Sequence, residues 1–444
     1  MVDNSLTIKR LSTADVGFEK KLASLLQREI LTTNEVTSVV RKILGAVRQR
    51  GDQAVIEYTK KFDGFCAQSV TDLLVTRRQM DVSLDQIAPK QRQALTHAAE
   101  RIRLYHERQK QSSWHYEEPD GSVYGQKISP LKRVGIYVPG GKANYPSSIL
   151  MLAIPAQVAG VKEIIATVPT AYGDEGQLVF AAASLAGISQ LYTIGGAQAI
   201  AALAFGTETV PCVDKITGPG NIYVTAAKKQ VYGEVGIDML AGPSELTIIC
   251  DGTTDPNWIA MDLFSQAEHD EQAQSILIST CNGFLDDVQA SINKLLPKME
   301  RREIIKASLV NRGIFILAED IEKAAVASNI IAPEHLEISV DAPEAVLSYI
   351  ENAGAIFLGR YTAESLGDYC AGPSHVLPTS GTAKFSSVLG VYDFQKRSSV
   401  INCSPAGAKK LAITAAELAR NENLEAHALS AEYRLEETFN SDKP

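Results

Sequence analysis

The chain changes from helical to strand periodicity at residues 134–141, which read VGIYVPGG. β-Branched and aromatic side chains favour a strand over the first five positions, and the proline and two glycines then end it. Three similar runs follow at residues 163–168, 190–194 and 213–217, each close to a glycine or proline turn. The repetition predicts several short strands of one sheet.

Helical stretches at residues 148–160 and 196–205 separate these strands. A second set of strands is predicted after residue 240, at residues 246–250, 275–279, 314–317 and 355–358. Strands that alternate with helices form parallel sheets covered on both faces through right-handed crossovers. The fold class is therefore α/β, with two successive units of similar size.

The turns after the first set of strands are candidate ligand sites, because open parallel sheets bind ligands outside the carboxyl ends of their strands. None of them is a Gly-x-Gly-x-x-Gly fingerprint, and residues 195–200 (GGAQAI) are only a loose relative. The turns alone therefore do not establish a nucleotide site.

Both ends of the chain read differently from the middle. Residues 1–125 are predicted to be mainly helical, and no further strand is expected beyond Pro378. Alanine-rich helices are predicted at residues 406–419 and 424–433, with a break at the asparagines of residues 421–423. The break matters because Glu422 and His427 would lie about 140° apart on an unbroken helix.

Composition limits the classes of partner. The 444 residues carry a net charge of −9, which argues against nucleic acid or an anionic membrane surface as a standing partner. Residues 1–10 lack the apolar core of a signal peptide, and no apolar run spans a bilayer, so we expect a cytoplasmic protein. The six cysteines include no Cys-x-x-Cys pair, which argues against a thiolate zinc cluster or a disulfide framework.

Candidate ligands for a metal ion gather in the second half of the chain. A helix opened by Asp255 and Pro256 is expected to place Gln266 and His269, three residues apart, on one face. Three later places each combine an acid with a histidine. They are Glu334-His335, the Gly/Pro-rich loop with Asp368 and His375, and the C-terminal segment with Glu422 and His427. Each residue alone also has an ordinary reading as a capping or loop residue. Together they form a mixed oxygen and nitrogen donor set, which suits zinc or a harder ion such as manganese.

Long motifs in the same order resemble the histidinol dehydrogenase family, and the resemblance runs from about residue 30 to residue 435. The motifs are YVPGG (137–141), GGAQAIAALAFGT (195–207), KITGPGN (215–221), IDMLAGPSEL (237–246), SQAEH (265–269), APEHL (332–336), GDYCAGPSHVLP (367–378) and ENLEAH (422–427). Several such motifs are far more specific than any metal-ligand spacing.

The resemblance implies two Rossmann-like domains, each an incomplete, doubly wound parallel sheet, with small helical N- and C-terminal segments. The implied boundaries are an N-terminal segment (1–30), a first α/β domain with the metal and catalytic residues (31–128 and 237–385), a second α/β domain on the NAD side (129–236) and a C-terminal segment (386–444) that contributes to the partner subunit's site.

The resemblance also implies a zinc-dependent homodimer that oxidises L-histidinol through L-histidinal to L-histidine with two NAD in succession. Four residues would hold zinc, one ion per subunit: Gln266, His269, Asp368 and, from the other subunit, His427. These ligands and four further residues would contact the substrate: Ser244, His335, His375 and Glu422. Three would contact NAD: Tyr137, Gln198 and Asn221. His335 would be the general base and Glu334 would activate water.

Two other functions stay open at this stage. A metal-dependent hydrolase could use the same donor set with Glu334 activating water, and it would need no nicotinamide pocket. A protein that binds an imidazole or an amino acid without turnover could keep the metal site alone, although the Glu334-His335 pair argues against it.

Overall fold

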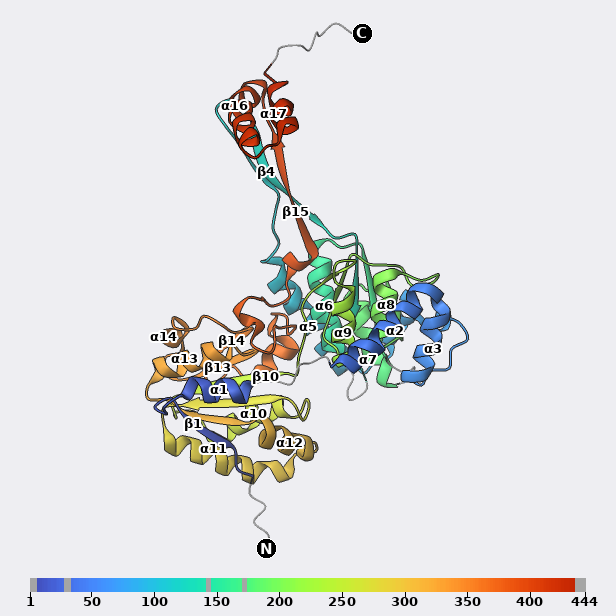
Figure 1. Ribbon diagram of the computed structural model, residues 1–444. Helices are drawn as coiled ribbons and strands as arrows, with labels where there is room; N and C mark the ends of the chain where they lie inside the picture. Colours follow the sequence, from blue (N-terminus) through green and yellow to red (C-terminus); the bar gives the residue numbers. More distant parts are fainter. Residues whose placement is uncertain (1–5, 28–32, 141–144, 170–173, 436–444) are drawn as a thin grey trace. The chain divides into compact units, whose positions relative to one another are not determined.

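The computed structural model describes residues 6–27, 33–140, 145–169 and 174–435. The chain divides into two compact units, of which the smaller consists of Lys110–Pro130 and Gln395–Pro444. The larger unit contains two parallel sheets, each covered by helices on both faces (Figure 1). Within the described residues, no helix is long and apolar enough to cross a membrane.

The first sheet of the larger unit has the order β2-β7-β6-β5-β8-β9, and only the β2–β7 pair is antiparallel. Its strands are β2 (Leu74–Val75), β5 (Arg133–Tyr137), β6 (Glu163–Thr167), β7 (Gln190–Tyr192), β8 (Lys215–Thr217) and β9 (Gly236–Ile237). One face packs against α4 (Arg77–Gln86), α5 (Pro89–Glu107), α6 (Pro146–Ala159) and α7 (Asp174–Leu185). The other packs against α2 (Asn34–Arg50), α3 (Asp52–Phe62), α8 (Gly196–Phe205) and α9 (Ile222–Val231).

The second sheet has the order β1-β12-β11-β10-β13-β14 and is parallel throughout. Its strands are β1 (Lys9–Ser12), β10 (Glu245–Cys250), β11 (Gln274–Ser279), β12 (Ile314–Leu317), β13 (His335–Ser339) and β14 (Ala355–Leu358). One face packs against α10 (Pro256–Ala267), α11 (Asn282–Leu295) and α12 (Arg302–Arg312). The other packs against α1 (Phe18–Leu26), α13 (Ile321–Ile331) and α14 (Pro343–Leu347). The central strands β10 and β13 are buried along their whole length, as expected for a covered parallel sheet.

The smaller unit is a three-stranded antiparallel sheet with two helices. Its elements are β3 (Trp114–Glu117), β4 (Val123–Pro130), β15 (Gln395–Asn402), α16 (Pro405–Asn421) and α17 (Glu425–Glu432). Asn423 adopts a left-handed conformation, with φ of 60°, between the two helices. The helix break predicted at residues 421–423 is thus confirmed.

The α/β class and all eight strands predicted from the sequence are confirmed within a few residues. The prediction that no strand follows Pro378 is wrong, because β15 pairs with β4 over eight residues. The N-terminal segment is not only helical, since β1 forms an edge of the second sheet. The helices between residues 34 and 107 pack on the first sheet, whereas the family resemblance implied that residues 31–128 belong with residues 237–385. An amphipathic pattern indicates which face of a helix is buried, but not which sheet buries it.

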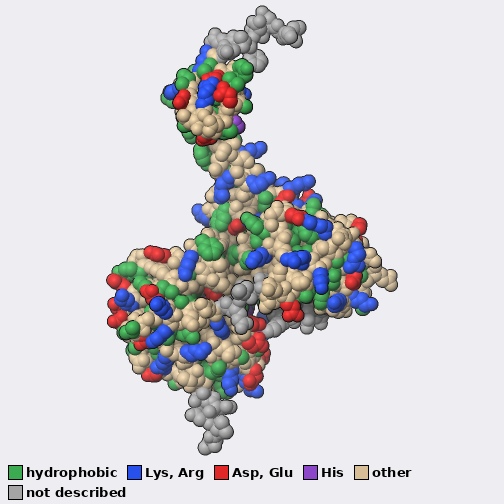
Figure 2. All heavy atoms as spheres, viewed as in Figure 1, with side chains coloured by type: hydrophobic (Ala, Val, Ile, Leu, Met, Phe, Trp, Pro, Cys, Tyr) green, Lys and Arg blue, Asp and Glu red, His purple; other side chains and the backbone are tan. Residues whose placement is uncertain are grey.

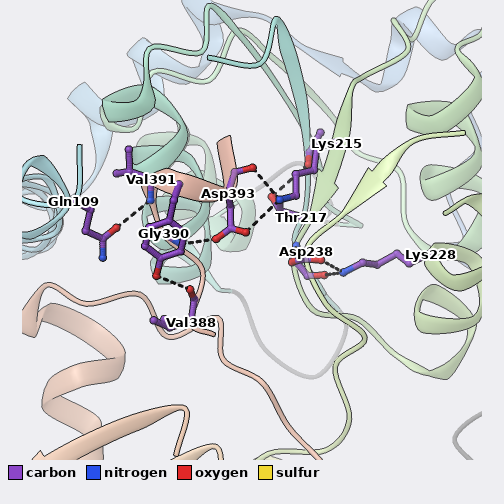
Figure 3. A network of polar contacts seen from close by, with 12 residues as sticks. Gln109, Lys215, Thr217, Lys228, Asp238, Val388, Gly390, Val391 and Asp393 are labelled. Atoms are coloured by element: carbon purple, nitrogen blue, oxygen red, sulfur yellow. Dashed lines mark hydrogen bonds and ion pairs between the residues drawn. The ribbon is translucent and has the colours of Figure 1, made fainter. Parts of the chain in front are cut away.

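A buried ion pair holds the turn after β8 in the first sheet (Figure 3). Asp238 accepts a hydrogen bond from the Gly218 N–H at 2.7 Å, and Lys228 donates to the Gly218 carbonyl at 2.8 Å. Gly218 has φ of 117°, and a Cβ atom there would collide with the Tyr137 carbonyl. The pair therefore fixes both backbone polar groups of a residue whose position only glycine can occupy.

A second ion pair in the same view anchors the start of β8. Lys215 donates to the backbone carbonyl of Asp393 at 2.8 Å and lies 3.2 Å from its carboxylate (Figure 3). The same carboxylate accepts the Gly390 N–H at 2.9 Å. The two pairs fix the strand at both of its ends.

Asp238→Asn should lower the free energy of unfolding by about 3–5 kcal/mol, because Lys228 would keep a buried charge without its counter-ion. Urea unfolding of the variant and the parent protein measures the difference. Asp85→Asn is the control, because Asp85 pairs with Arg92 at the surface and its loss should cost about 1 kcal/mol or less. Equal, small losses in both variants would show that the buried pair does not hold the turn.

Candidate active site

Glu334 and His335 lie at the amino end of β13, beside the start of β10. Both side chains bind the backbone of Glu245. The His335 Nδ1 donates to the Glu245 carbonyl at 3.1 Å, and a Glu334 carboxylate oxygen accepts the Glu245 N–H at 2.9 Å. His335 is 3% exposed and Glu334 7%, so two titratable groups are fixed in a site nearly free of water.

Three carboxylates surround the His335 ring. Glu364 lies 3.4 Å and Glu334 3.8 Å from Nδ1, and Asp368 lies 3.4 Å from Nε2. Burial opposes the charged imidazolium, but the three carboxylates outweigh burial and raise the pKa of His335 well above its ordinary value. Burial raises the pKa of Glu334 to about 8, although the neighbouring His335 works against that shift. Glu334 can therefore exchange a proton near neutral pH, whereas the surrounding carboxylates favour the protonated ring of His335.

Further acids lie close to His335 and to one another, and they were not among the site residues predicted from the sequence. Glu337 accepts the Glu364 N–H at 2.7 Å. Burial raises the pKa of Glu337 well above its usual range, that of Glu364 to about 8 and that of Asp262 to about 6. The alternation in residues 335–339 (HLEIS) could have revealed Glu337 as a buried acid, had that run been predicted as a strand.

Gln266 lies in the last turn of α10 and is fully buried. Neither its amide oxygen nor its amide nitrogen has a hydrogen-bond partner among the described residues. Buried amides in native proteins are almost always paired, so this one indicates a missing ligand. His269 does not continue the helix as predicted: α10 ends at Ala267, and the His269 N–H bonds the Gln266 carbonyl at 3.3 Å in the turn that follows.

Asp368 lies in a short π-helix, η3 (Gly367–Ala371), next to the one-turn helix α15 (Glu364–Leu366). Its backbone carbonyl accepts a hydrogen bond from His375 Nδ1 at 2.9 Å, and His375 Nε2 lies 3.2 Å from the Ser148 hydroxyl of α6. Arg101 of α5 donates to the carbonyls of Cys370 and Ala371 at 2.8 and 3.1 Å. Helices of the first sheet thus hold the loop that carries Asp368 and His375.

Two sets of residues could hold a metal ion. Ligand atoms of His335, Glu364 and Asp368 lie within 4.8 Å of one another. The set expected from the sequence shares only Asp368 with this group. We favour Gln266, His269 and Asp368, because the Gln266 amide has no partner whereas His335 and Glu364 already pair with each other. The negative charge of Asp368 also acts on His269, which places both in one electrostatic environment.

The remaining predicted substrate residues fall in two places. Ser244 directly precedes Glu245, the residue of β10 whose backbone binds Glu334 and His335. Glu422 and His427 belong to the smaller unit and are exposed there, at the junction of α16 and α17. The larger unit therefore supplies Ser244, Gln266, His269, Glu334, His335, Asp368 and His375.

The three predicted NAD contacts lie at the carboxyl end of β5 (Tyr137), in the first turn of α8 (Gln198) and at the N-cap of α9 (Asn221). The Tyr137 hydroxyl accepts the Gly196 N–H at 3.2 Å, and Asn221 caps α9 through the N–H groups of Tyr223 and Val224. Gln198 is buried and donates to Asp63 at 3.2 Å. Asp63 was not expected here, because it comes from the end of α3, far away in the sequence.

The comparisons with known proteins agree on one family. Residues 26–435 match the family model described as histidinol dehydrogenase. The chain is 60% identical to a histidinol dehydrogenase of Pseudomonas putida, over 97% of this chain and 98% of that one. It is 61% identical to one of Pseudomonas aeruginosa, over 96% and 97%. The crystal structure of histidinol dehydrogenase from Elizabethkingia anophelis superposes with a TM-score of 0.91 at 34% identity, over 97% of this chain and 99% of that one.

Proposed function

Since the chain belongs to the histidinol dehydrogenase family and is therefore an oxidoreductase, we propose that it oxidises L-histidinol through L-histidinal to L-histidine with two NAD. These are the last steps of histidine biosynthesis. The observation that carries the proposal is the buried Glu334-His335 pair, fixed by the backbone N–H and carbonyl of Glu245 and surrounded by further acids. A homodimer in the cytoplasm completes the proposal, and both features stay predictions.

Zinc would be held by Gln266, His269 and Asp368. The donor types are those zinc accepts, and the unpaired Gln266 amide supports a ligand at this position. The ion, when bound, would fix the amino and imidazole nitrogens of the substrate and so orient the reacting carbon. The partner subunit's His427 would complete the set.

His335 would act as the general base for the alcohol. Its Nδ1 donates to the Glu245 carbonyl, so in the neutral ring Nε2 carries the free lone pair. Nε2 takes the proton of the substrate hydroxyl while a hydride leaves the carbon that bears this hydroxyl and passes to the nicotinamide. The alcohol thereby becomes an aldehyde. Glu364 and Glu334 beside Nδ1 stabilise the imidazolium that forms.

Glu334 would act in the second oxidation. A water must add to the aldehyde carbon before another hydride can leave, and Glu334 takes one proton of that water as the C–O bond forms. A carboxylate whose pKa lies about 8 is a stronger base than an ordinary glutamate. The His335 imidazolium left by the first oxidation returns its proton to the aldehyde oxygen, which completes the hydrate and restores the neutral ring. His335 then removes a hydroxyl proton of the hydrate as the second hydride leaves for the nicotinamide, and the carboxylic acid that forms ionises to the carboxylate product.

A dimer with shared sites is supported by the smaller unit. Its sheet and helices expose large apolar side chains, among them Ile401, Ile413, Leu418 and Tyr433, and Figure 2 shows hydrophobic side chains on the surface of this unit. These side chains would be buried if another chain covered the unit, as the proposed dimer requires. His427 and Glu422 are exposed in the same unit and would act in the other subunit's site.

Removal of zinc should abolish NADH formation from L-histidinol, and added zinc should restore it. The absorbance of NADH before and after chelation measures this. A metal-dependent hydrolase would release no NADH in either state, and that result would overturn the proposal.

Gln266→Leu should weaken zinc binding by about tenfold or more, because it removes a ligand atom from a buried site. Competition with a chromogenic chelator measures the zinc affinity directly, without an activity assay. Gln272→Leu is the matched control, since Gln272 is exposed five residues after α10 ends. Unchanged affinity in Gln266→Leu would remove this residue from the metal site.

Glu334→Gln should slow the oxidation of L-histidinal by about 10²-fold or more and that of L-histidinol far less, because only the aldehyde step needs an activated water. Single-turnover assays started from each compound separate the two half-reactions. Glu344→Gln, an exposed control, should affect neither. Equal losses in both half-reactions would contradict the role given to Glu334.

Mixed subunits should test the shared site. If His427 acts in the other subunit, His335→Asn and His427→Ala proteins, each inactive alone, should regain about one quarter of the parent activity after equal mixing and exchange. Half of the dimers would then be hybrids, each with one intact site. Absence of rescue after verified exchange would place His427 in the site of its own chain.

A further inference from the structure

The first sheet contains a carboxylate placed for the ribose of a dinucleotide. With β5 taken as the first strand, the central order β7-β6-β5-β8-β9 is 3-2-1-4-5, and the order reverses between β5 and β8. Dinucleotides bind at the carboxyl ends beside such a reversal, and an acid near the end of the second strand binds the ribose hydroxyls. Here the second strand, β6, ends at Thr167 and continues as Val168-Pro169, with no acid at that point.

Asp63 brings a carboxylate to this edge from another element. It follows α3, and one of its oxygens, Oδ2, accepts the Gly195 N–H at 3.1 Å and the Gln198 amide N–H at 3.2 Å. The other oxygen, Oδ1, has no hydrogen-bond partner among the described residues. One oxygen thus fixes the turn after β7 while the other remains free for a ligand.

Two glycines allow the turns around Asp63 to pack closely. A Cβ atom on Gly195 would lie 2.9 Å from Asp63 Oδ1 and 2.6 Å from Pro169, and one on Gly140 would lie 2.6 Å from the Pro169 carbonyl. Pro169, which follows β6, therefore fits against the residues that follow β5 and β7 only because both positions lack a side chain.

Gln198 supplies a further, independent sign of a ligand. It is fully buried, and its Oε1 has no partner among the described residues, although its Nε2 is bound by Asp63. Gly196 next to it has φ of 62°, and a Cβ atom there would lie 2.7 Å from that oxygen. A buried amide oxygen without a partner can accept a hydrogen bond from a hydroxyl or amino group of a ligand.

We propose that Asp63 determines coenzyme selectivity, binding the adenosine ribose hydroxyls of NAD through Oδ1 and excluding the 2′-phosphate of NADP. The inference rests on the proposed function, because it requires a nicotinamide coenzyme at this edge. A carboxylate accepts hydrogen bonds from a diol but repels a phosphate at the same place, so it selects by repulsion as much as by attraction.

Asp63→Asn tests the assignment, because it keeps the shape of the side chain and removes the charge. The ratio of kcat/KM for NADP to that for NAD, with L-histidinol saturating, should rise about tenfold or more relative to the parent protein. Asp85→Asn removes one surface charge from α4 and should leave the ratio unchanged. Asp63→Glu keeps the charge and should retain selectivity for NAD.

An unchanged ratio in Asp63→Asn would overturn the proposal while leaving the proposed function intact. A parent protein that reduces neither coenzyme would instead overturn the proposed function. In that case the thermal stabilisation of each protein by NAD and by NADP decides the role of Asp63 without turnover. Equal stabilisation of the parent protein by NAD and by NADP would exclude a role of Asp63 in coenzyme selectivity.

Discussion

The burial of His335 among carboxylates is the constraint on which the site depends. An imidazole ring that is 3% exposed would lose its charge if burial acted alone, and three carboxylates within 3.8 Å reverse that tendency. The ring in turn lowers the pKa of Glu334 and Glu364, which burial raises. Proton transfer at the site therefore follows from a balance of buried charges rather than from any one residue.

The two sheets of the larger unit share the strand order 3-2-1-4-5, but their candidate functional residues lie at opposite ends of the strands. The first sheet gathers glycine turns at its carboxyl ends, where dinucleotides bind. The second sheet presents Glu334 and His335 at the amino end of β13. Contacts from Arg101 and Ser148 to the loop of Asp368 and His375 connect the site to helices of the first sheet.

The sequence predicted eight strands correctly because β-branched runs between glycine turns are local signals, but it missed β13, the strand that carries His335. The motifs predicted the family. The sequence did not predict which sheet covers the helices of residues 34–107, since partners distant in the chain leave no local pattern. Asp63 was missed for the same reason, because its role comes from a contact with a turn distant in the chain, whereas Glu337 was missed because residues 335–339 were not predicted as a strand. The end of α10 at Ala267 was missed because Glu268 and His269 are compatible with a helix.

The number of NADH formed per L-histidinol consumed tests the central claim most directly. The claim is that one buried pair, Glu334 and His335, serves two successive oxidations at the same carbon. Two NADH per substrate, with L-histidine as the product, is the expected result. One NADH with release of the aldehyde would contradict it, because the pair would then complete only the first oxidation.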